Sequence, residues 1–432
     1  MASQPEDHLK SLIDTWVHGF THPGAIVGMF DKDGKDIFYH EANTTKEGFC
    51  EGSNAVNYKR DTIFRIYSMT KPITAVAAMI LVERGLLSLD DDVSKWIPSF
   101  KNLKVYVSGT GEDLVTEDLN TPLKVHHLFT HTSGIVYGLF GKSMCDKILA
   151  QNVGIDMATG MRNTSLSNLC EMISKTPLLF QPGTKFEYGL GLDVLGHVIE
   201  LVSGQTLDIF FENEIFQPLN MIDTSFFVSP EKLQRFAKCY EVSTGMSFKQ
   251  STLHARTESF HSKPENLSGG GGLLSTIDDY SRFTTMLLNI GIYKNKNNEE
   301  KRLLSEETIN KMTTNVLPNQ CDIHDIATAP GFLEVDGGGY GFGLSMYILT
   351  NPNVAQGGSL SNKGEYGWGG FASTSFFVDP ISQFSCIFMT QLIPSNVYPI
   401  RGHLRYLSHW VMNEKKRLFL LETEKQHENE NS

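Results

Sequence analysis

Apolar and polar residues alternate over residues 25–40, "AIVGMFDKDGKDIFYH", on both sides of an Asp-Gly pair at positions 33 and 34. A period of two is typical of a β-strand with one buried face, and Asp-Gly is a preferred pair for a tight turn. These residues therefore predict a β-hairpin. Residues 337–349 and 371–393 also alternate or run apolar, and Asp379-Pro380 divides the second of these segments. We expect its two halves to form adjacent antiparallel strands.

The segments between these two groups of strands have the apolar patterns of helices. Residues 73–82, "ITAVAAMILV", are apolar on nearly all sides, and the following Arg84-Gly85 is typical of a helix end, so we expect a buried helix. From about residue 88 to residue 291 the pattern is mainly helical with long loops. Further helices are predicted over residues 192–204 and 399–421, and another is expected to begin after a capping residue at Ser275 or Thr276. Residues 293–302 are predicted to form a polar loop.

Strands near both ends with helices between them predict an α+β architecture. We expect one antiparallel sheet built from both termini and flanked by helices, with a mainly helical region inserted in the middle. The predicted boundaries are residues 1–85 together with 335–424 for the sheet region, 86–334 for the helical insertion and 425–432 for a flexible tail.

Composition and charge narrow the classes of function. The chain has 432 residues, 40% of them hydrophobic and 20% charged, as in soluble globular proteins. Its formal net charge of -12 argues against nucleic acid, whose phosphates select basic surfaces. The longest apolar run, residues 73–82, is too short to span a bilayer, and the start of the chain lacks the apolar core of a secretory signal. The six cysteines include no Cys-x-x-Cys pair, so we expect reduced thiols, no metal site, no cofactor and a cytoplasmic location.

Ser68 and Lys71 stand three residues apart directly before the apolar run, in "RIYSMTKPIT", residues 65–74. Pro72 has no N–H and is tolerated in the first turn of a helix, which places the helix start near Ser68. Residues three apart share a helix face, so the hydroxyl and the amine can meet. The helix N-terminus and burial both disfavour charge on Lys71, and a neutral amine beside a hydroxyl is a workable base and nucleophile. An N-capping serine followed by a solvated lysine is the alternative.

Several further segments favour the catalytic interpretation. The stretch "YSMTKPITAVAAMILVERGLLSLDD" resembles the nucleophile segment of the serine β-lactamase and penicillin-binding superfamily, in particular its class C branch and the related carboxylesterases and transesterases. The other matches, in the family's order, are "HHLFTHTSGI" (126–135), "PGTKFEYGLGLDVLGHVIELVSG" (182–204), "SGGGGLLSTIDDYSRF" (268–283) and "YGWGGFASTSFFVDP" (366–380). Together they extend over residues from about 20 to 415, which implies a β-lactamase-like fold.

The resemblance implies a third catalytic residue, Tyr188. Where the family has Tyr-Ser-Asn, this chain has Tyr188-Gly189-Leu190. By resemblance, Tyr188 is a partner base whose phenolate is stabilised by Lys71 and which passes the proton to the leaving group. An aromatic residue packed in a loop is the alternative. The missing Asn amide, which holds the substrate's amide carbonyl in β-lactamases, makes a purely β-lactamase function less favoured.

A second departure from β-lactamases is Trp368-Gly369-Gly370, where those enzymes have Lys-Thr-Gly. An indole cannot bind a carboxylate as an ammonium group does, but it can line a pocket for an apolar acyl or alcohol group. Paired glycines allow the strand backbone to come close to a substrate. The alternative is that these glycines serve only a tight hairpin. By resemblance, the backbone N–H groups of Ser68 and Phe371 form the oxyanion hole. The residues assigned to substrate binding are Trp368, Gly369, Gly370 and Tyr67.

The segment "HTSGI" offers a second histidine and serine, His131 and Ser133. The resemblance implies a structural role for both, holding a turn. The chain contains neither Gly-x-Ser-x-Gly nor His-Glu-x-x-His, so the α/β-hydrolase and zincin signatures are missing.

These observations predict a metal-independent serine hydrolase that acts on small-molecule carboxylic esters through an acyl-enzyme on Ser68. An acyltransferase, a weak β-lactamase or a D-amino-acid peptidase is the alternative within enzymes. A catalytically idle scaffold is the alternative of another class, and the oligomeric state stays open.

Overall fold

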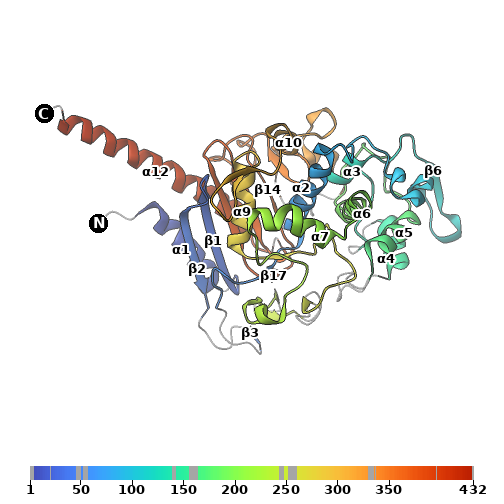
Figure 1. Ribbon diagram of the computed structural model, residues 1–432, viewed down its shortest axis with the longest axis horizontal. Coiled ribbons are helices and arrows are strands. Elements are labelled where there is room, and N and C mark those ends of the chain that lie inside the picture. Colours follow the sequence, from blue (N-terminus) through green and yellow to red (C-terminus); the bar gives the residue numbers. More distant parts are fainter. Residues whose placement is uncertain are drawn as a thin grey trace.

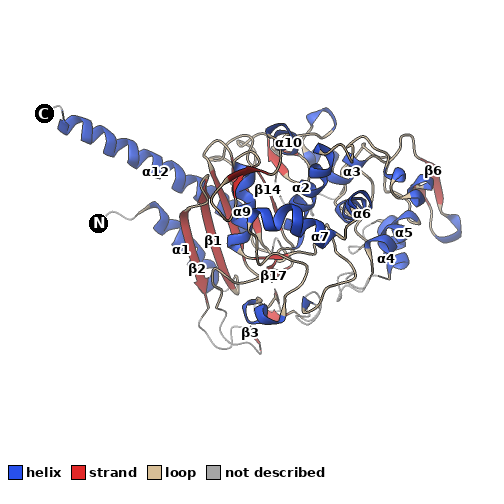
Figure 2. Ribbon diagram, in the orientation of Figure 1, coloured by secondary structure: helices blue, strands red, loops and turns tan. Residues whose placement is uncertain are grey.

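The computed structural model of the protein (Figure 1) describes residues 4–19, 21–44, 50–51, 57–138, 143–154, 164–242, 248–251, 260–328, 335, 337–395 and 397–430. Its α-helices are α1 Pro5–His18, α2 Thr70–Glu83, α3 Val125–Phe129, α4 Met144–Val153, α5 Leu166–Ser174, α6 Gly191–Ser203, α7 Leu207–Phe211, α8 Gln217–Leu219, α9 Ile277–Leu288, α10 Glu306–Met312, α11 Ile323–Ile326 and α12 Ile400–Glu430. Its strands (Figure 2) are β1 Gly24–Asp31, β2 Asp36–Asn43, β3 Cys50–Glu51, β4 Phe64–Arg65, β5 Lys104–Ser108, β6 Val115–Asp118, β7 Tyr240–Val242, β8 Phe248–Gln250, β9 Leu274–Ser275, β10 Ile292–Lys294, β11 Glu300–Arg302, β12 Tyr340–Phe342, β13 Tyr347–Leu349, β14 Tyr366–Gly369, β15 Ser375–Asp379, β16 Phe384–Met389 and β17 Leu392–Ile393.

The central feature is a seven-stranded sheet with the strand order β12-β13-β14-β15-β16-β1-β2. All neighbouring pairs are antiparallel, and β1 from the start of the chain pairs with β16 from its end. The predicted hairpin around Asp33 and the predicted pair of strands on either side of Asp379-Pro380 are both present. The α+β class and the sheet built from both ends of the chain are therefore confirmed.

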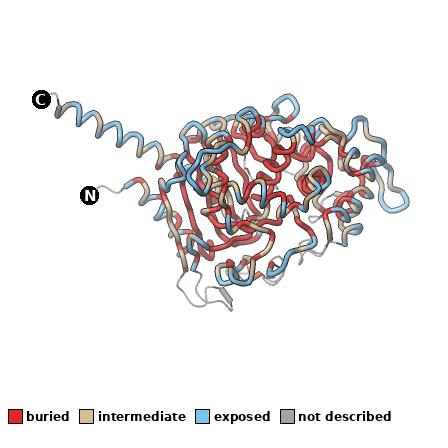
Figure 3. Tube along the Cα trace, viewed as in Figure 1, coloured by how far each residue is buried: buried red, intermediate tan, exposed pale blue. Residues whose placement is uncertain are grey.

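Both faces of this sheet are covered, which explains why its middle strands are apolar on both sides (Figure 3). On one face, Val27 and Phe388 pack with residues of α1 and α12, such as Leu9 and Leu404. On the other face, Ile26 and its neighbours belong to a larger core that includes α2, α6 and α9. The molecule is thus layered, with helix α2 buried on the side of the sheet away from α12.

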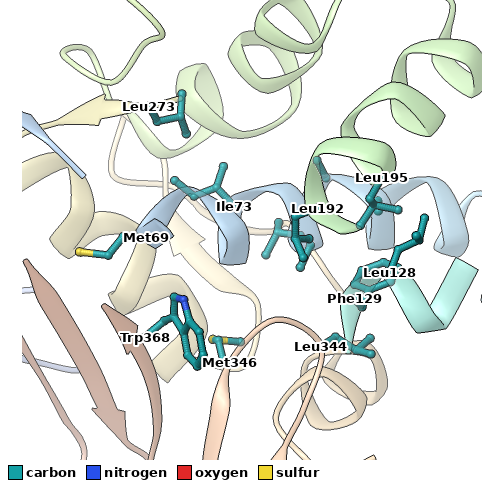
Figure 4. Close-up of a cluster of buried hydrophobic side chains, with 14 of the residues drawn as sticks. Met69, Ile73, Leu128, Phe129, Leu192, Leu195, Leu273, Leu344, Met346 and Trp368 are labelled. Atoms are coloured by element: carbon teal, nitrogen blue, oxygen red, sulfur yellow. The ribbon is translucent and has the colours of Figure 1, made fainter. Parts of the chain in front are cut away.

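Helix α2 is buried from Thr70 to Leu81, as its uniform apolar sequence predicts. It packs against α6, and Figure 4 shows Leu192 and Leu195 of α6 lying against it in the buried cluster. Among the described residues no single helix is long and apolar enough to cross a membrane. Helix α6 and the segment Leu207–Leu219 pass that test only as a pair, which is bent by 80°.

The structure differs from the expected elements in three places. Residues predicted as a polar loop form the antiparallel hairpin of β10 and β11, in which the oppositely charged Lys294 and Glu300 face each other across the strands. Residues around Val93 and Pro98, expected to be helical, form only short 3-10 helices. Helix α12 continues to Glu430, so residues 425–430 of the predicted tail are helical, while 431–432 lie outside the described residues.

The domain boundaries at residues 86 and 334 remain a prediction. The predicted insertion contains short strands such as β5 and β7 besides its helices. The five cysteines whose side chains are described are free thiols.

Candidate active site

Ser68 lies at the entrance of α2, in a 3-10 helix, Tyr67–Met69, that leads directly into Thr70. Pro72 occupies the first turn of α2, as predicted, where its missing N–H leaves no helical bond unmade. Tyr67 has a positive φ of 42°, a left-handed conformation that costs a non-glycine residue about 1 kcal/mol. This conformation of Tyr67 turns the backbone directly before Ser68 and so orients the Ser68 side chain.

Lys71 is fully buried, so the alternative of a solvated lysine is wrong. Its Nζ lies 3.2 Å from Ser68 Oγ and donates a 2.6 Å hydrogen bond to the carbonyl oxygen of Gly270. Burial lowers the pKa of Lys71 to about 7, and the charge of Asp193 opposes this effect. The amine is therefore largely uncharged slightly above neutral pH, the state that the sequence predicts.

Tyr188 comes from a loop 120 residues further along the chain, and its hydroxyl donates a 2.6 Å hydrogen bond to Ser68 Oγ. The Lys71 Nζ lies 4.6 Å from the centre of the Tyr188 ring. Burial raises the pKa of Tyr188 above its ordinary value, and neighbouring Tyr137 raises it further. The raised pKa favours the protonated phenol, and the role of Tyr188 as a base whose phenolate Lys71 stabilises stays a prediction.

Aromatic side chains surround the three residues. Tyr137, which the sequence did not single out, stacks on Tyr188 with ring centres 5.8 Å apart. Trp368 packs against Tyr188 from another side, also at 5.8 Å, and is only 1% exposed. In this structure the indole supports Tyr188 from within the core, whereas Tyr137 and Tyr188 are half-buried.

The end of β14 lies against the segment that carries Ser68. A Cβ atom on Gly370 would be 2.4 Å from the carbonyl oxygen of Ile66, so this approach requires glycine. The rings of Phe371 and Tyr67 then pack edge to face, with centres 5.8 Å apart. The two segments whose amides were assigned to the oxyanion hole are thus neighbours. Gly369, the last residue of β14, pairs with Ser375.

His131 and Ser133 lie behind the site. His131 is 1% exposed, and its Nδ1 accepts a 3.4 Å hydrogen bond from the amide of Gly189, next to Tyr188. Ser133 Oγ accepts a hydrogen bond from the amide of Ile135. These contacts hold the backbone of two loops, as the structural interpretation of this segment expects.

Two further residues of the site were not predicted. Gly270 belongs to the glycine run of the matched segment 268–283, to which no site residue was assigned, and its carbonyl accepts a hydrogen bond from Lys71. Asp193 is a buried carboxylate in the first turn of the otherwise apolar helix α6. An acidic residue inside an apolar stripe is the signal that could have identified it, because buried charges need partners.

Comparisons with known proteins identify the family of this chain. A family model described as Beta-lactamase matches residues 13–408. Esterase EstB of Burkholderia gladioli is 30% identical over 373 residues, which cover 82% of this chain and 83% of that protein. Acyltransferase calJ of Penicillium decumbens is 26% identical over 351 residues, covering 78% of this chain and 77% of the relative.

Among solved structures, simvastatin synthase (LovD) from Aspergillus terreus has the same fold. It superimposes with a TM-score of 0.77 at 22% identity, over 96% of this chain and 99% of that one. The family match over most of the chain and the relative at 30% identity lead to one conclusion: this protein belongs to the beta-lactamase family.

Proposed function

We propose that the protein is a serine hydrolase that cleaves small-molecule carboxylic esters through an acyl-enzyme on Ser68. The observation that carries this proposal is the pair of contacts at Ser68 Oγ, 2.6 Å from the Tyr188 hydroxyl and 3.2 Å from the buried Lys71 amine. Nucleophile and bases within hydrogen-bond reach are what acyl transfer requires. The similarity to an esterase and an acyltransferase of the same family supports the choice of ester substrates.

The neutral Lys71 amine accepts the proton of Ser68 as Oγ attacks the ester carbonyl. The amides of Ser68 and Phe371 stabilise the tetrahedral oxyanion, each by about 3 kcal/mol. Tyr188 then donates its proton to the departing alkoxide and is reprotonated by the Lys71 ammonium, so the phenol and the amine both return to their resting states. Water or an alcohol releases the acyl group, and the identity of that acceptor separates hydrolysis from acyl transfer.

The substrate side of the proposal rests on the half-buried aromatic residues around Ser68, which are Tyr67, Tyr137, Tyr188 and Phe371. They favour an ester with an apolar acyl or alcohol group. The assignment of Trp368, Gly369 and Gly370 to substrate binding stays a prediction, as does the cytoplasmic location.

A fluorophosphonate probe tests the nucleophile directly. We expect intact-mass spectrometry to show one adduct, which peptide mapping places on Ser68, and we expect Ser68→Ala and Lys71→Ala to abolish it. Ser281→Ala is the matched control, because Ser281 and Ser68 are both 7% exposed. A folded protein that gains no adduct would instead support the scaffold alternative.

Substrate class is tested with nitrophenyl esters of increasing acyl length beside the β-lactam nitrocefin. We expect ester cleavage that depends on Ser68, and nitrocefin turnover much slower than that of the best ester. Adding an alcohol and measuring the new ester by mass spectrometry determines how the acyl group divides between water and the alcohol. Nitrocefin as the preferred substrate would contradict the proposal and favour a β-lactamase.

A further inference from the structure

The glycine run between Ser268 and Gly272 is held tightly against α2. Its Gly269 carbonyl accepts a 2.7 Å hydrogen bond from Thr74 Oγ1, and its Gly270 carbonyl accepts the 2.6 Å bond from Lys71 Nζ. The amide of Leu273 donates a 3.1 Å hydrogen bond to Thr70 Oγ1. Three successive contacts therefore join the loop to the first turns of the helix that carries Lys71.

The other side of the same loop is held by Asp193 of α6. Asp193 Oδ1 accepts a 2.5 Å hydrogen bond from Ser268 Oγ and a 3.3 Å hydrogen bond from the amide of Gly270. Burial raises the pKa of Asp193, whereas these two donors and the Lys71 amine favour its ionised form. Asp193 also lies in the first turn of α6, where the helix dipole favours a negative charge.

The loop has no room for side chains at these contacts. A Cβ atom on Gly270 would be 2.3 Å from Asp193 Oδ2, and one on Gly269 would be 2.5 Å from the carbonyl oxygen of Leu192. The glycines therefore allow the backbone to pass between α2 and α6 while touching a carboxylate on one side and an amine on the other.

We propose that Asp193 is a positioning residue for Lys71: it fixes the Gly270 peptide, whose carbonyl orients the amine toward Ser68, and its negative charge acts on that amine. The amide and the carbonyl of Gly270 transmit the first effect, because the amide donates to Asp193 and the carbonyl accepts from Lys71. This inference rests on the proposed function, in which the Lys71 amine is the base.

The other titratable groups that face Lys71 are uncharged near neutral pH. Tyr137 and Tyr188 have their rings 5.9 Å and 4.6 Å from Lys71 Nζ, and burial raises the pKa of both. Burial lowers the pKa of His131 well below its usual value, which leaves the imidazole neutral. Asp193 raises the pKa of Lys71 against the larger effect of burial.

The Asp193→Asn variant tests both effects. The amide preserves the shape of the side chain but removes the charge, so Lys71 should lose its proton at a lower pH. We expect the acidic limb of the kcat/KM profile for a nitrophenyl ester to move down by about one pH unit. We also expect the plateau to fall about tenfold, because the Gly270 peptide is held less well. A merely structural role would lower the rate without moving the limb.

Asp279→Asn is the matched control. Asp279 is also a carboxylate only 1% exposed, but it holds Asp223 and Thr224 on another part of the fold. We expect its substitution to leave the acidic limb in place. An equal shift in both variants would overturn the proposal, since any lost charge would then have the same effect.

The charge of Lys71 is also measured without activity, by NMR titration of lysines labelled at the ε-carbon, with Lys71→Met to assign the signal. A lower titration midpoint in Asp193→Asn supports the proposal even if no ester is cleaved, and an unchanged midpoint contradicts it.

If Asp193→Asn does not fold, Ser268→Ala is the second variant, because it removes one hydrogen bond between the loop and Asp193 and keeps the carboxylate. That variant should lower the plateau several-fold with the limb unmoved, and an unchanged plateau would contradict the positioning role.

Discussion

At the scale of single residues, the chemistry of the site depends on how completely Lys71 is removed from water. An exposed lysine is protonated at neutral pH and cannot accept a proton. The buried amine, with a pKa of about 7, can do so near the middle of the physiological range. Burial raises the pKa of Tyr188, which favours its protonated form, so in the proposed mechanism the phenol donates a proton and the amine accepts one.

The first prediction is the pH dependence of acylation. Because the amine must be unprotonated, kcat/KM should fall about tenfold per pH unit below the Lys71 pKa and level off above it. Stopped-flow release of nitrophenol between about pH 5 and pH 9 measures this limb. A profile that is flat through neutral pH, or one whose limb lies near the ordinary lysine pKa, would exclude Lys71 as the free base.

The second prediction concerns the Tyr188 hydroxyl. Tyr188→Phe keeps the ring stacked on Tyr137 and packed against Trp368 but removes the donor 2.6 Å from Ser68 Oγ. We expect kcat/KM to fall by about 100-fold or more while the melting temperature changes little. Comparable activity of the phenylalanine variant would show that Lys71 alone handles the proton.

At the scale of elements, the site is formed where α2, α6, the glycine loop and β14 meet. The close approach of the end of β14 to the segment that carries Ser68 requires glycine at position 370. A Cβ there would be 2.3 Å from Thr374 Oγ1 and 2.4 Å from the carbonyl oxygen of Ile66, so the strand end would have to move.

The third prediction is therefore that Gly370→Ala lowers the free energy of unfolding by about 1–3 kcal/mol and strongly reduces labelling of Ser68. Urea denaturation and fluorophosphonate labelling measure the two effects. Gly402→Ala, where the nearest atom is 3.5 Å from the added Cβ, serves as the control and should be neutral or slightly stabilising. Normal labelling of a stable Gly370→Ala protein would mean that the close approach is not needed.

At the scale of the whole molecule, a buried polar network joins α12 to the sheet. Glu365, fully buried just before β14, forms an ion pair with Arg405 at 2.8 Å and a hydrogen bond with His409 Nε2 at 2.7 Å. Burial alone would raise the pKa of Glu365, but Arg405 and His409 lower it below its ordinary value. Its stabilising contribution is therefore present above the carboxylate's unfolded pKa and is lost as the pH falls through the folded value. Beyond this anchor, α12 extends away from the rest of the molecule (Figure 1).

The fourth prediction is that Glu365→Gln destabilises the fold by about 3–5 kcal/mol, because the charge of Arg405 is left buried without its partner. Chemical denaturation measures this loss. Asp118→Asn, which breaks an ion pair with Lys104 whose side chains are 87% and 49% exposed, should change stability by less than about 1 kcal/mol. Equal effects of the two substitutions would contradict the structural importance of the network.

Patterns along the chain were sufficient to predict the α+β class, the hairpin around Asp33 and the buried helix after Ser68, and they singled out Ser68, Lys71 and Tyr188 as candidate catalytic residues. These features follow from local periods, from turn and cap residues, and from motifs in a recognisable order. The burial of Lys71, the position of Trp368 in the core and the raised pKa of Tyr188 follow from the folded chain, because burial depends on segments far apart in the sequence. The contact of Asp193 with the glycine loop, 77 residues away, arises in the same way. The acidic residue within an apolar helix indicates that a partner is needed, but the identity of that partner follows only once α2 and α6 have packed together.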